Sequence, residues 1–153
     1  MLSNKAKYAL KALRLLATEQ GKGPILISHI AKHEGIPRKF LEQILLELRK
    51  EGILYSKVGK GGGYILSKKP NEINLGEVIR TIDGPLAPTA CASVTAYHAC
   101  NECEDVETCE IRVIMREVRD ATANILENKT VADLVNLSVL LEKKSKKKKD
   151  LVK

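Results

Sequence analysis

All four cysteines of this 153-residue sequence fall in one stretch, CASVTAYHACNECEDVETC. They are Cys91, Cys100, Cys103 and Cys109, so the gaps between them are eight, two and five residues. Thiolates are soft ligands that suit iron-sulfur clusters and zinc, and four thiolates match the usual ligand count of a cluster. The spacing therefore predicts a metal-binding loop, and an iron-sulfur cluster of the two-iron or the four-iron type is the favoured occupant.

Three other interpretations of the cysteines stay open. Structural zinc sites more often show two separated CxxC pairs, and this loop has one such pair. A thiol or disulfide redox switch is disfavoured because nearby carboxylates raise thiol pKa values. Unligated cysteines are the third alternative. The acidic residues around the loop are Glu102, Glu104, Asp105, Glu107 and Glu110.

The rest of the sequence places this loop in a reducing compartment. No run approaches the roughly 20 apolar residues that a membrane span requires. The first residues, MLSNKAKYALKALRLLA, have an amphipathic basic pattern rather than that of a cleaved signal. We therefore expect a cytoplasmic protein, in which clustered cysteines are more often metal ligands than disulfides. An enzyme is not expected, because no set of nucleophile, base and orienting group can be assembled.

The net charge of +7 is unevenly distributed. Residues 1–70 hold fourteen Lys and Arg against five Asp and Glu, whereas residues 71–142 hold five against thirteen. A basic first half joined to an acidic second half indicates one face for phosphates and another face for a different task.

The basic half has the pattern of a helix-turn-helix. Apolar residues at helical spacing predict a first helix over residues 3–20, and a short strand is expected at residues 25–27. Ser28 is placed to cap a second helix that Gly35 ends. Pro37 is placed to open a third helix that ends before Gly52. The apolar stripe of that third helix is Phe40, Leu41, Ile44, Leu45 and Leu48.

A hairpin with lysines at its tip follows the third helix. Two short strands, residues 53–55 and 64–66, flank the glycine-rich turn VGKGGG. The turn follows a strand without opening a helix, so a nucleotide-binding loop is not indicated. A basic hairpin directly behind a recognition helix predicts a winged helix, in which the helix enters the major groove of DNA and the wing reaches phosphates or the minor groove.

Polar side chains off the apolar stripe are the candidate DNA contacts. Gln43 can pair with adenine, Arg38 or Lys39 with guanine or phosphate, and Glu42 can accept from cytosine. The complete set of predicted DNA-binding residues is Ser28, Arg38, Lys39, Glu42, Gln43, Lys57 and Lys60.

Helices also flank the cysteine loop. A short helix is expected from Leu75 to Ile82 with Asn74 as its cap. After the loop, apolar residues at i, i+3, i+4 and i+7 spacing predict a long amphipathic helix that ends at Asn128. Thr130 and Asp133 have the spacing of a capping arrangement for a last helix. The stripe of the long helix is Ile111, Ile114, Met115, Val118, Ala121 and Ile125.

Four segments follow from these patterns. They are a winged-helix module (1–83), a cysteine-rich sensor loop (84–109), a long helix with a C-terminal helix (110–142) and a disordered lysine-rich tail (143–153). Like charges repel in such a tail, which can add salt-sensitive DNA affinity or serve as a solubilising segment. The predicted fold class is mainly α with a small β-hairpin wing.

Several of these motifs together resemble the Rrf family of winged-helix transcription regulators. The resemblance rests on ISHIAKHEGIPRKFLEQILLELRKEGIL, then GGGYIL, then NLGEVIRTIDG and the cysteine loop, and it covers roughly residues 2–140. The family includes an iron-sulfur cluster regulator, a nitric-oxide sensor and a cysteine-metabolism repressor. The resemblance implies a homodimer that binds a partly palindromic DNA operator, with the long helix as its dimerisation helix and, in many members, an iron-sulfur cluster as its sensor.

The resemblance also implies a ligand set. It places Cys91, Cys103 and Cys109 at the usual three ligands, with Cys100 as the leading fourth candidate and His98 and Asp105 as runners-up. Relatives use a histidine or a partner's acidic residue at the places that Arg112 and Tyr8 take here, and neither of these two side chains suits that role. Relatives also commonly carry an arginine where the wing has Val58, which puts minor-groove insertion by an arginine in doubt.

The sequence thus predicts a dimeric DNA-binding transcription regulator that is controlled by an iron-sulfur cluster in the cysteine loop. We expect this regulator to act as a repressor. One alternative is a cluster-free regulator of the cysteine-metabolism type, controlled by a regulatory protein partner or by thiol redox state. Another is a small redox or metal-handling protein on a winged-helix scaffold. The signal that the loop senses, whether iron, oxygen, nitric oxide or redox state, stays open.

Overall fold

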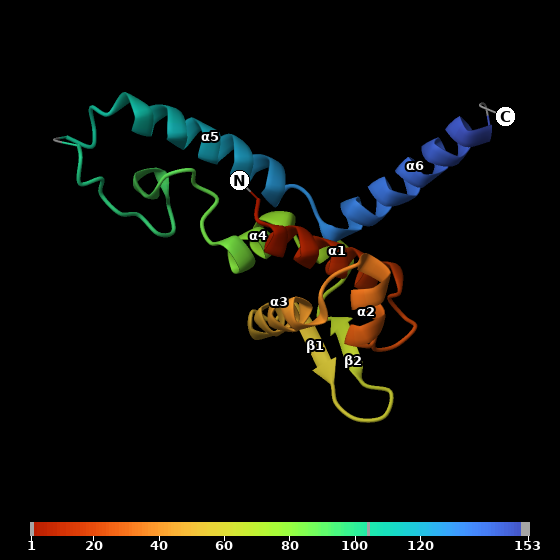
Figure 1. The fold of residues 1–153 in the computed structure, drawn as a ribbon. Coiled ribbons are helices and arrows are strands. Elements are labelled where there is room, and N and C mark those ends of the chain that lie inside the picture. Colours follow the sequence, from red (N-terminus) through yellow and green to blue (C-terminus); the bar gives the residue numbers. More distant parts are fainter. Residues whose placement is uncertain (1, 104, 151–153) are drawn as a thin grey trace.

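The structure is a computed structural model that describes residues 2–103 and 105–150 (Figure 1). Its helices and strands are α1 (Asn4–Thr18), α2 (Ile27–Glu34), α3 (Arg38–Lys50), β1 (Leu54–Lys57), β2 (Gly63–Leu66), α4 (Leu75–Asp83), α5 (Glu110–Glu127) and α6 (Val131–Asp150). Two short 3-10 turns, η1 (Pro70–Glu72) and η2 (Ala90–Ala92), lie before α4 and in the cysteine loop. The predicted fold class, mainly α with a small hairpin wing, is confirmed.

Helix α1 lies at the centre of the core and contacts α3, α4 and α6. Aromatic residues are scarce, so the core is aliphatic, and at its edge the rings of Tyr8 and Phe40 pack edge to face with centroids 5.8 Å apart. This contact uses the Tyr8 side chain for packing between α1 and α3. The largest fully buried side chains of α1, α2 and α3 are Leu13, Ile30, Leu41, Ile44, Leu45 and Leu48.

The helix-turn-helix begins differently from the prediction. Ser28 does not cap α2, because the helix already starts at Ile27, with Leu26 at the N-cap position and no side-chain capping hydrogen bond. The Leu26 carbonyl accepts from the backbone N–H groups of His29 and Ile30, so the helix starts closer to the N-terminus than predicted. Gly35 ends α2 in the left-handed conformation at φ 65°, as expected.

The wing is an antiparallel hairpin in which Leu54 pairs with Leu66 and Lys57 with Gly63. The prediction of a strand at residues 25–27 was wrong, since Ile27 belongs to α2. Of these three residues, Ile25 alone forms a β-bridge, which pairs it with Tyr64. The two residues of that bridge exchange backbone hydrogen bonds of 3.0 and 2.9 Å. The base of the wing is therefore attached to the segment that precedes α2.

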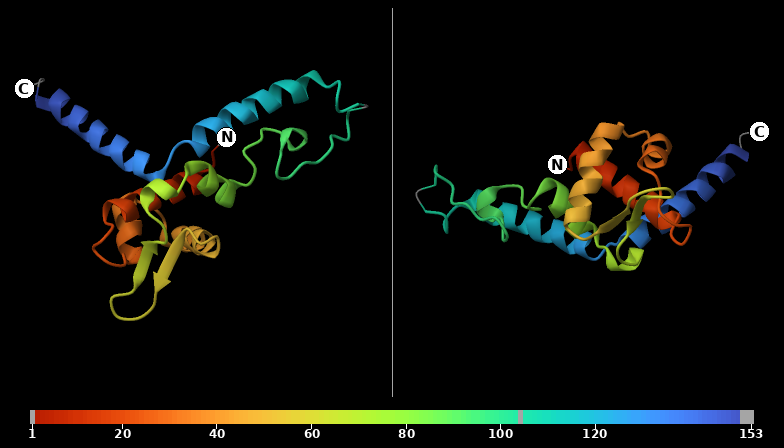
Figure 2. Two further views of the ribbon diagram at one scale, coloured as in Figure 1. Left: turned by 180° about the vertical axis from the view of Figure 1, so that it is seen from behind. Right: turned by 90° about the horizontal axis from the view of Figure 1, so that it is seen from below.

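Helices α5 and α6 leave the body in different directions (Figures 1 and 2). Their junction is attached to the start of α4 and the residues before it, where Leu75 N–H donates to the Lys129 carbonyl at 2.8 Å and Val131 N–H to the Ile73 carbonyl at 2.9 Å. Val131 is completely buried. On the other side of α4, Arg80 pairs with Glu127 at 2.7 Å. The end of α5 and the start of α6 are therefore both connected to α4 and the residues before it.

Helix α6 starts with the predicted capping arrangement, since Thr130 N–H donates to Asp133 at 2.8 Å and Asp133 N–H to the Thr130 hydroxyl at 3.4 Å. The helix extends to Asp150, beyond the point at which a disordered tail was expected to begin, and residues 151–153 of that tail lie outside the described residues. None of the helices in the described part of the chain combines the length and the apolar character of a membrane span.

Candidate metal centre and nucleic-acid interface

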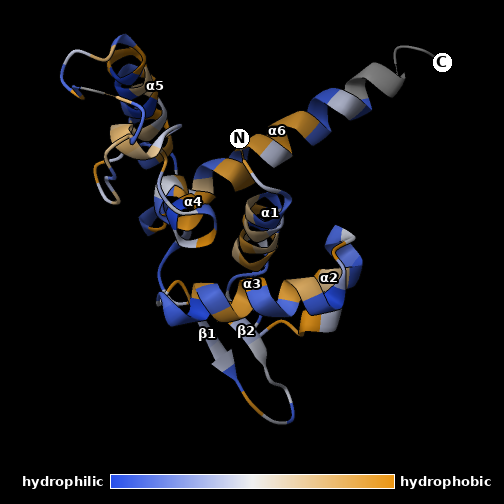
Figure 3. Ribbon diagram, turned by 60° about the vertical axis from the view of Figure 1, so that its left-hand side comes forward, coloured by the Kyte–Doolittle hydropathy of each residue, from blue (hydrophilic) through white to orange (hydrophobic). Residues whose placement is uncertain are grey.

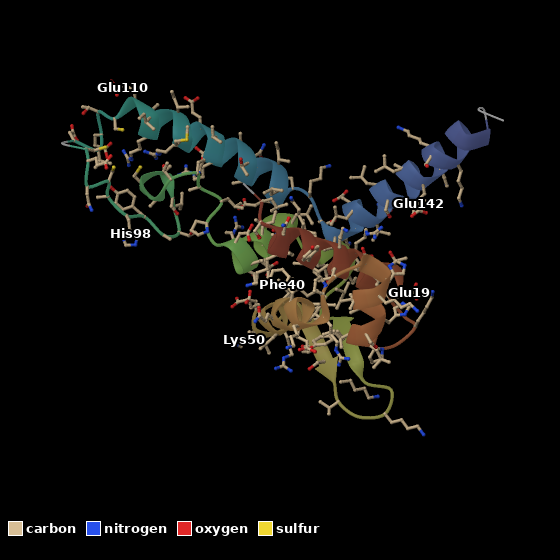
Figure 4. All side chains as sticks on the ribbon, viewed as in Figure 1. Glu19, Phe40, Lys50, His98, Glu110 and Glu142 are labelled. Atoms are coloured by element: carbon tan, nitrogen blue, oxygen red, sulfur yellow. The ribbon has the colours of Figure 1, made fainter. Side chains whose placement is uncertain are left out.

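The cysteine loop joins α4 to α5 and surrounds one pocket of about 360 Å³. Cys109 is the N-cap residue of α5, and Cys91 lies in η2 at the other end of the loop. Figure 4 shows the side chains of this loop, with His98 in its middle and Glu110 where α5 begins. All four cysteines line the pocket together with His98 and Arg112. The fold therefore brings the predicted cysteine ligands to one place.

Two of the thiols are in direct contact. The Cys103 thiol donates to Cys109 Sγ at 3.8 Å. The thiols of Cys100 and Cys109 raise the pKa of Cys103 to about 12. The backbone amide of Arg112, followed by the Cys103 thiol, holds the pKa of Cys109 below its ordinary value. The Arg112 amide belongs to the first turn of α5, whose free backbone N–H groups favour a negative charge at this end of the helix. Cys109 is thus the member of this pair that ionises first.

The donor set fits a thiolate-bound metal centre. Two thiolates on one tetrahedral metal with bonds of about 2.3 Å lie about 3.8 Å apart, which matches the separation of the Cys103 and Cys109 sulfur atoms. Among the described residues, however, no three His, Cys, Asp or Glu side chains already form a ligand group. Of the runners-up, His98 is exposed and lines the pocket, and Asp105 accepts from the backbone N–H of Glu107 at 2.9 Å.

Arginines of α5 hold the loop in a way that the sequence did not reveal. Arg112 donates to the Cys91 carbonyl and the Val106 carbonyl, both at 3.2 Å. Arg119 donates to the Ala92 carbonyl at 2.6 Å. The only signal in the sequence was their separation of seven residues, which places both on one face of a helix.

The predicted DNA-binding side chains lie on a different part of the molecule. Helix α3 and the wing are at the end of the body away from the cysteine loop (Figure 1). The stripe of α3 is buried in the core except for Phe40, which is half-buried. This burial turns the polar side of α3 to solvent. The candidate contacts Ser28, Arg38, Lys39, Glu42, Gln43, Lys57 and Lys60 are all exposed.

Contacts within this surface orient the helix and the wing. Arg38 and Glu42 form an ion pair of 3.2 Å one turn apart on α3. Arg49, near the end of α3, donates to the Ser56 hydroxyl on β1 at 3.0 Å. Val58 at the tip of the wing is 92 % exposed, so this position presents an apolar side chain between two lysines. Helix α3 and the wing are thus joined by a side-chain hydrogen bond.

Comparison with known proteins identifies the family. The model of the Rrf2 family, described as iron-dependent transcriptional regulators, matches residues 2–137. An rrf2-like HTH-type transcriptional regulator of Rhodobacter capsulatus is 41 % identical over 138 residues, covering 88 % of this chain and 92 % of that protein. The HTH-type transcriptional regulator IscR of Pectobacterium carotovorum is 33 % identical over 141 residues, covering 92 % of this chain and 82 % of the relative.

Solved structures agree with this assignment. CymR, the global cysteine regulator of B. subtilis, superposes with a TM-score of 0.73 at 29 % identity, over 90 % of this chain and 97 % of its own. IscR of T. potens superposes with a TM-score of 0.71 at 27 % identity, over 90 % of this chain and 88 % of its own. The matched family and these relatives are transcription regulators, not enzymes, and the exposed polar side of α3 suits their DNA partner. The chain belongs to the Rrf2 family of DNA-binding transcription regulators.

Proposed function

We propose that this regulator binds its DNA operator as a homodimer, with an affinity set by an iron-sulfur cluster on Cys91, Cys100, Cys103 and Cys109. The observation that carries the proposal is the single pocket that these four thiols line. The description of the family as iron-dependent and the similarity to IscR support the same choice of metal.

A dimer is supported by the large apolar side chains of α5 that stay exposed in the single chain. This helix has 18 residues, and none of them is buried within the chain. Apolar residues nevertheless recur along it at heptad-like spacing, and Figure 3 colours α5 in a mixture of hydrophobic and hydrophilic segments. A stripe of this kind requires a covering surface in water. A second α5 related by two-fold symmetry supplies an identical apolar stripe. The large exposed members of the stripe are Ile111, Ile114, Val118 and Ile125, which are 66, 55, 44 and 61 % exposed.

A series of helix contacts links the cysteine loop to α3, the proposed DNA-binding helix. Cys109 caps α5, and α5 contacts α4, which in turn packs against α1 and α3. When bound, the cluster supplies a rigid four-thiolate anchor for the loop. The residues of the loop then hold α5 at one angle to the winged helix. That angle sets the spacing of the two recognition helices across successive major grooves.

One experiment tests the proposal. The protein is purified without oxygen, its visible spectrum is recorded, iron, sulfide and zinc are assayed, and binding to a DNA site selected from a random pool is measured before and after removal of iron. We expect a coloured protein with iron and sulfide in equal amounts and an operator affinity that changes on iron removal. Cluster control is contradicted if the protein is colourless and free of iron as purified and still binds its operator, or if its operator affinity is the same before and after iron is removed.

A cluster-free regulator is the second candidate, and two observations favour it. CymR, the cysteine regulator, superposes with a TM-score of 0.73. In addition, the described cysteines do not form a ready-made ligand group. Such a regulator responds to a partner protein or to thiol oxidation, and the same purification distinguishes it by unchanged DNA binding without iron.

A further inference from the structure

Two arginines of α5 hold the segment that carries the first cysteine. Arg112 Nε donates to the carbonyl oxygen of Cys91 at 3.2 Å, and Arg119 Nη1 donates to the carbonyl oxygen of Ala92 at 2.6 Å. The two guanidinium groups therefore bind consecutive carbonyls from one face of the helix. Both arginine side chains are only 14 % exposed, which is low for this residue type.

Arg112 also holds the other limb of the loop. Its Nη1 donates to the Val106 carbonyl at 3.2 Å and pairs with the Glu107 carboxylate at 3.0 Å. One side chain is thus bonded to residues on both sides of Cys100 and Cys103. A guanidinium group can do this because its five N–H donors lie in a fixed plane, whereas a lysine offers a single nitrogen.

The burial pattern follows these contacts. Ala92 and Ser93 are 1 and 7 % exposed, and η2 packs against α5. The next residues, 94–99, are all exposed. The loop is therefore docked where the arginines hold it and open between those points.

We infer that Arg112 and Arg119 form a clasp that orders the cysteine loop on α5 before any ligand binds. Both are positioning residues, because they bond to the backbone that carries the candidate ligands. Ordering the loop in advance lowers the entropic cost of assembling four ligands from distant parts of the loop. The inference deepens the proposed function and rests on it for its biological meaning, whereas the clasp itself exists in the metal-free chain.

Hydrogen exchange of the metal-free protein tests the clasp directly. The Arg112→Ala variant should increase amide exchange in residues 89–93 and 105–109 by about tenfold, since hydrogen bonds to charged groups are lost. Arg112→Lys should show much of the same increase in exchange, because lysine keeps the positive charge but lacks the planar set of N–H donors. The matched control is Arg116→Ala, an exposed arginine of the same helix for which the described residues provide no hydrogen-bond partner.

The melting temperature of the winged-helix body should stay the same in all three variants, because Arg112 lies outside the main core. Unchanged exchange in Arg112→Ala overturns the clasp. Full protection in Arg112→Lys overturns the role of the planar fork.

Iron retention provides a second measurement. The proteins are first reconstituted with Fe²⁺ and sulfide without oxygen. A chelator should then remove iron from Arg112→Ala about tenfold faster than from the wild type or from Arg116→Ala. Equal release rates contradict a role for the clasp in ligand assembly. If no variant and no wild-type protein takes up iron, the proposed cluster fails, and the exchange experiment still decides the clasp.

Discussion

Gly63 of the wing lies so close to the backbone of Ile25 that a Cβ atom on Gly63 would be 2.9 Å from the Ile25 nitrogen and closer still to its carbonyl. Gly63 also has φ 147°, a conformation that residues with a side chain rarely adopt. We expect Gly63→Ala to break the bridge between Ile25 and Tyr64, to destabilise the protein by about 2 kcal/mol or more and to weaken DNA binding through a displaced wing.

The control for this prediction is Gly61→Ala in the same turn. Gly61 has φ 78° but no atom within 4 Å of an added Cβ, so only the cost of its backbone conformation applies, about 1 kcal/mol. Urea denaturation and DNA-shift assays compare the two variants. Equal stability of the two variants would show that the contact with Ile25 is unimportant.

The wing lysines and the recognition helix should affect DNA binding in different ways. Replacing Lys57 and Lys60 with Gln should weaken binding to all DNA and lower the slope of log affinity against log salt by about 0.9 for each lost phosphate contact. Replacing Arg38, Lys39 and Gln43 with Ala should instead reduce discrimination, by about 1–3 kcal/mol for each lost base contact.

Shift assays with operator and unrelated DNA at several salt concentrations distinguish these effects. The assignment of α3 as the recognition helix is refuted if the triple variant discriminates the operator as well as the wild type does.

Cys100 should be the fourth ligand of the cluster. Cys100→Ala removes one of the four thiols that line the pocket and should strip the cluster, seen as loss of visible absorbance and of bound iron. His98→Ala and Asp105→Asn are the matched variants and should keep the cluster. Full iron occupancy in Cys100→Ala would transfer the fourth role to one of these residues or to an external ligand.

A charge in the apolar stripe of α5 should separate the dimer. Ile114 is 55 % exposed in the single chain, and a two-fold axis places two copies of each substitution in one interface. Ile114→Lys should weaken dimerisation by about a hundredfold, because like charges then meet in a desolvated contact. Sedimentation velocity measures the change. Val58→Lys on the wing tip adds the same charge far from α5 and should remain dimeric, and a dimeric Ile114→Lys would place the interface elsewhere.

The start of α6 should make stability depend on pH. The backbone N–H of Thr130, followed by its hydroxyl, lowers the pKa of Asp133 from its ordinary value. A lowered folded-state pKa adds stability above the unfolded-state value of about 3.9, and that stability is lost as the pH falls through the folded-state value. The wild type should therefore exceed Asp133→Asn in stability near neutral pH.

Denaturation curves between about pH 7 and pH 3 test this dependence. The advantage of the wild type over Asp133→Asn should shrink at the acid end, whereas Glu142→Gln, an exposed change on the same helix, should follow the wild type throughout. A constant difference between wild type and Asp133→Asn would mean that the carboxylate charge is not the cause.

The helices were largely predictable because their signals are local. The apolar spacing in α3, the cap at Asn74, the left-handed Gly35 and the pair Thr130 and Asp133 each act within a few residues, and the structure contains all of them. The incorrect strand prediction at residues 25–27 has a tertiary cause. Ile25 pairs with Tyr64, a residue far along the chain, and that bridge belongs to the wing and not to a separate strand.

The sequence by itself determined the winged-helix class, the polar residues of α3 and the four clustered cysteines of the loop, since residue type and spacing carry this information. Only the tertiary structure decided that the four thiols share one pocket, that Arg112 spans both limbs of the loop and that the large apolar residues Ile111, Ile114, Val118 and Ile125 of α5 stay exposed in the single chain. These are contacts between residues distant in sequence, and their geometry depends on how α4, η2 and α5 pack together.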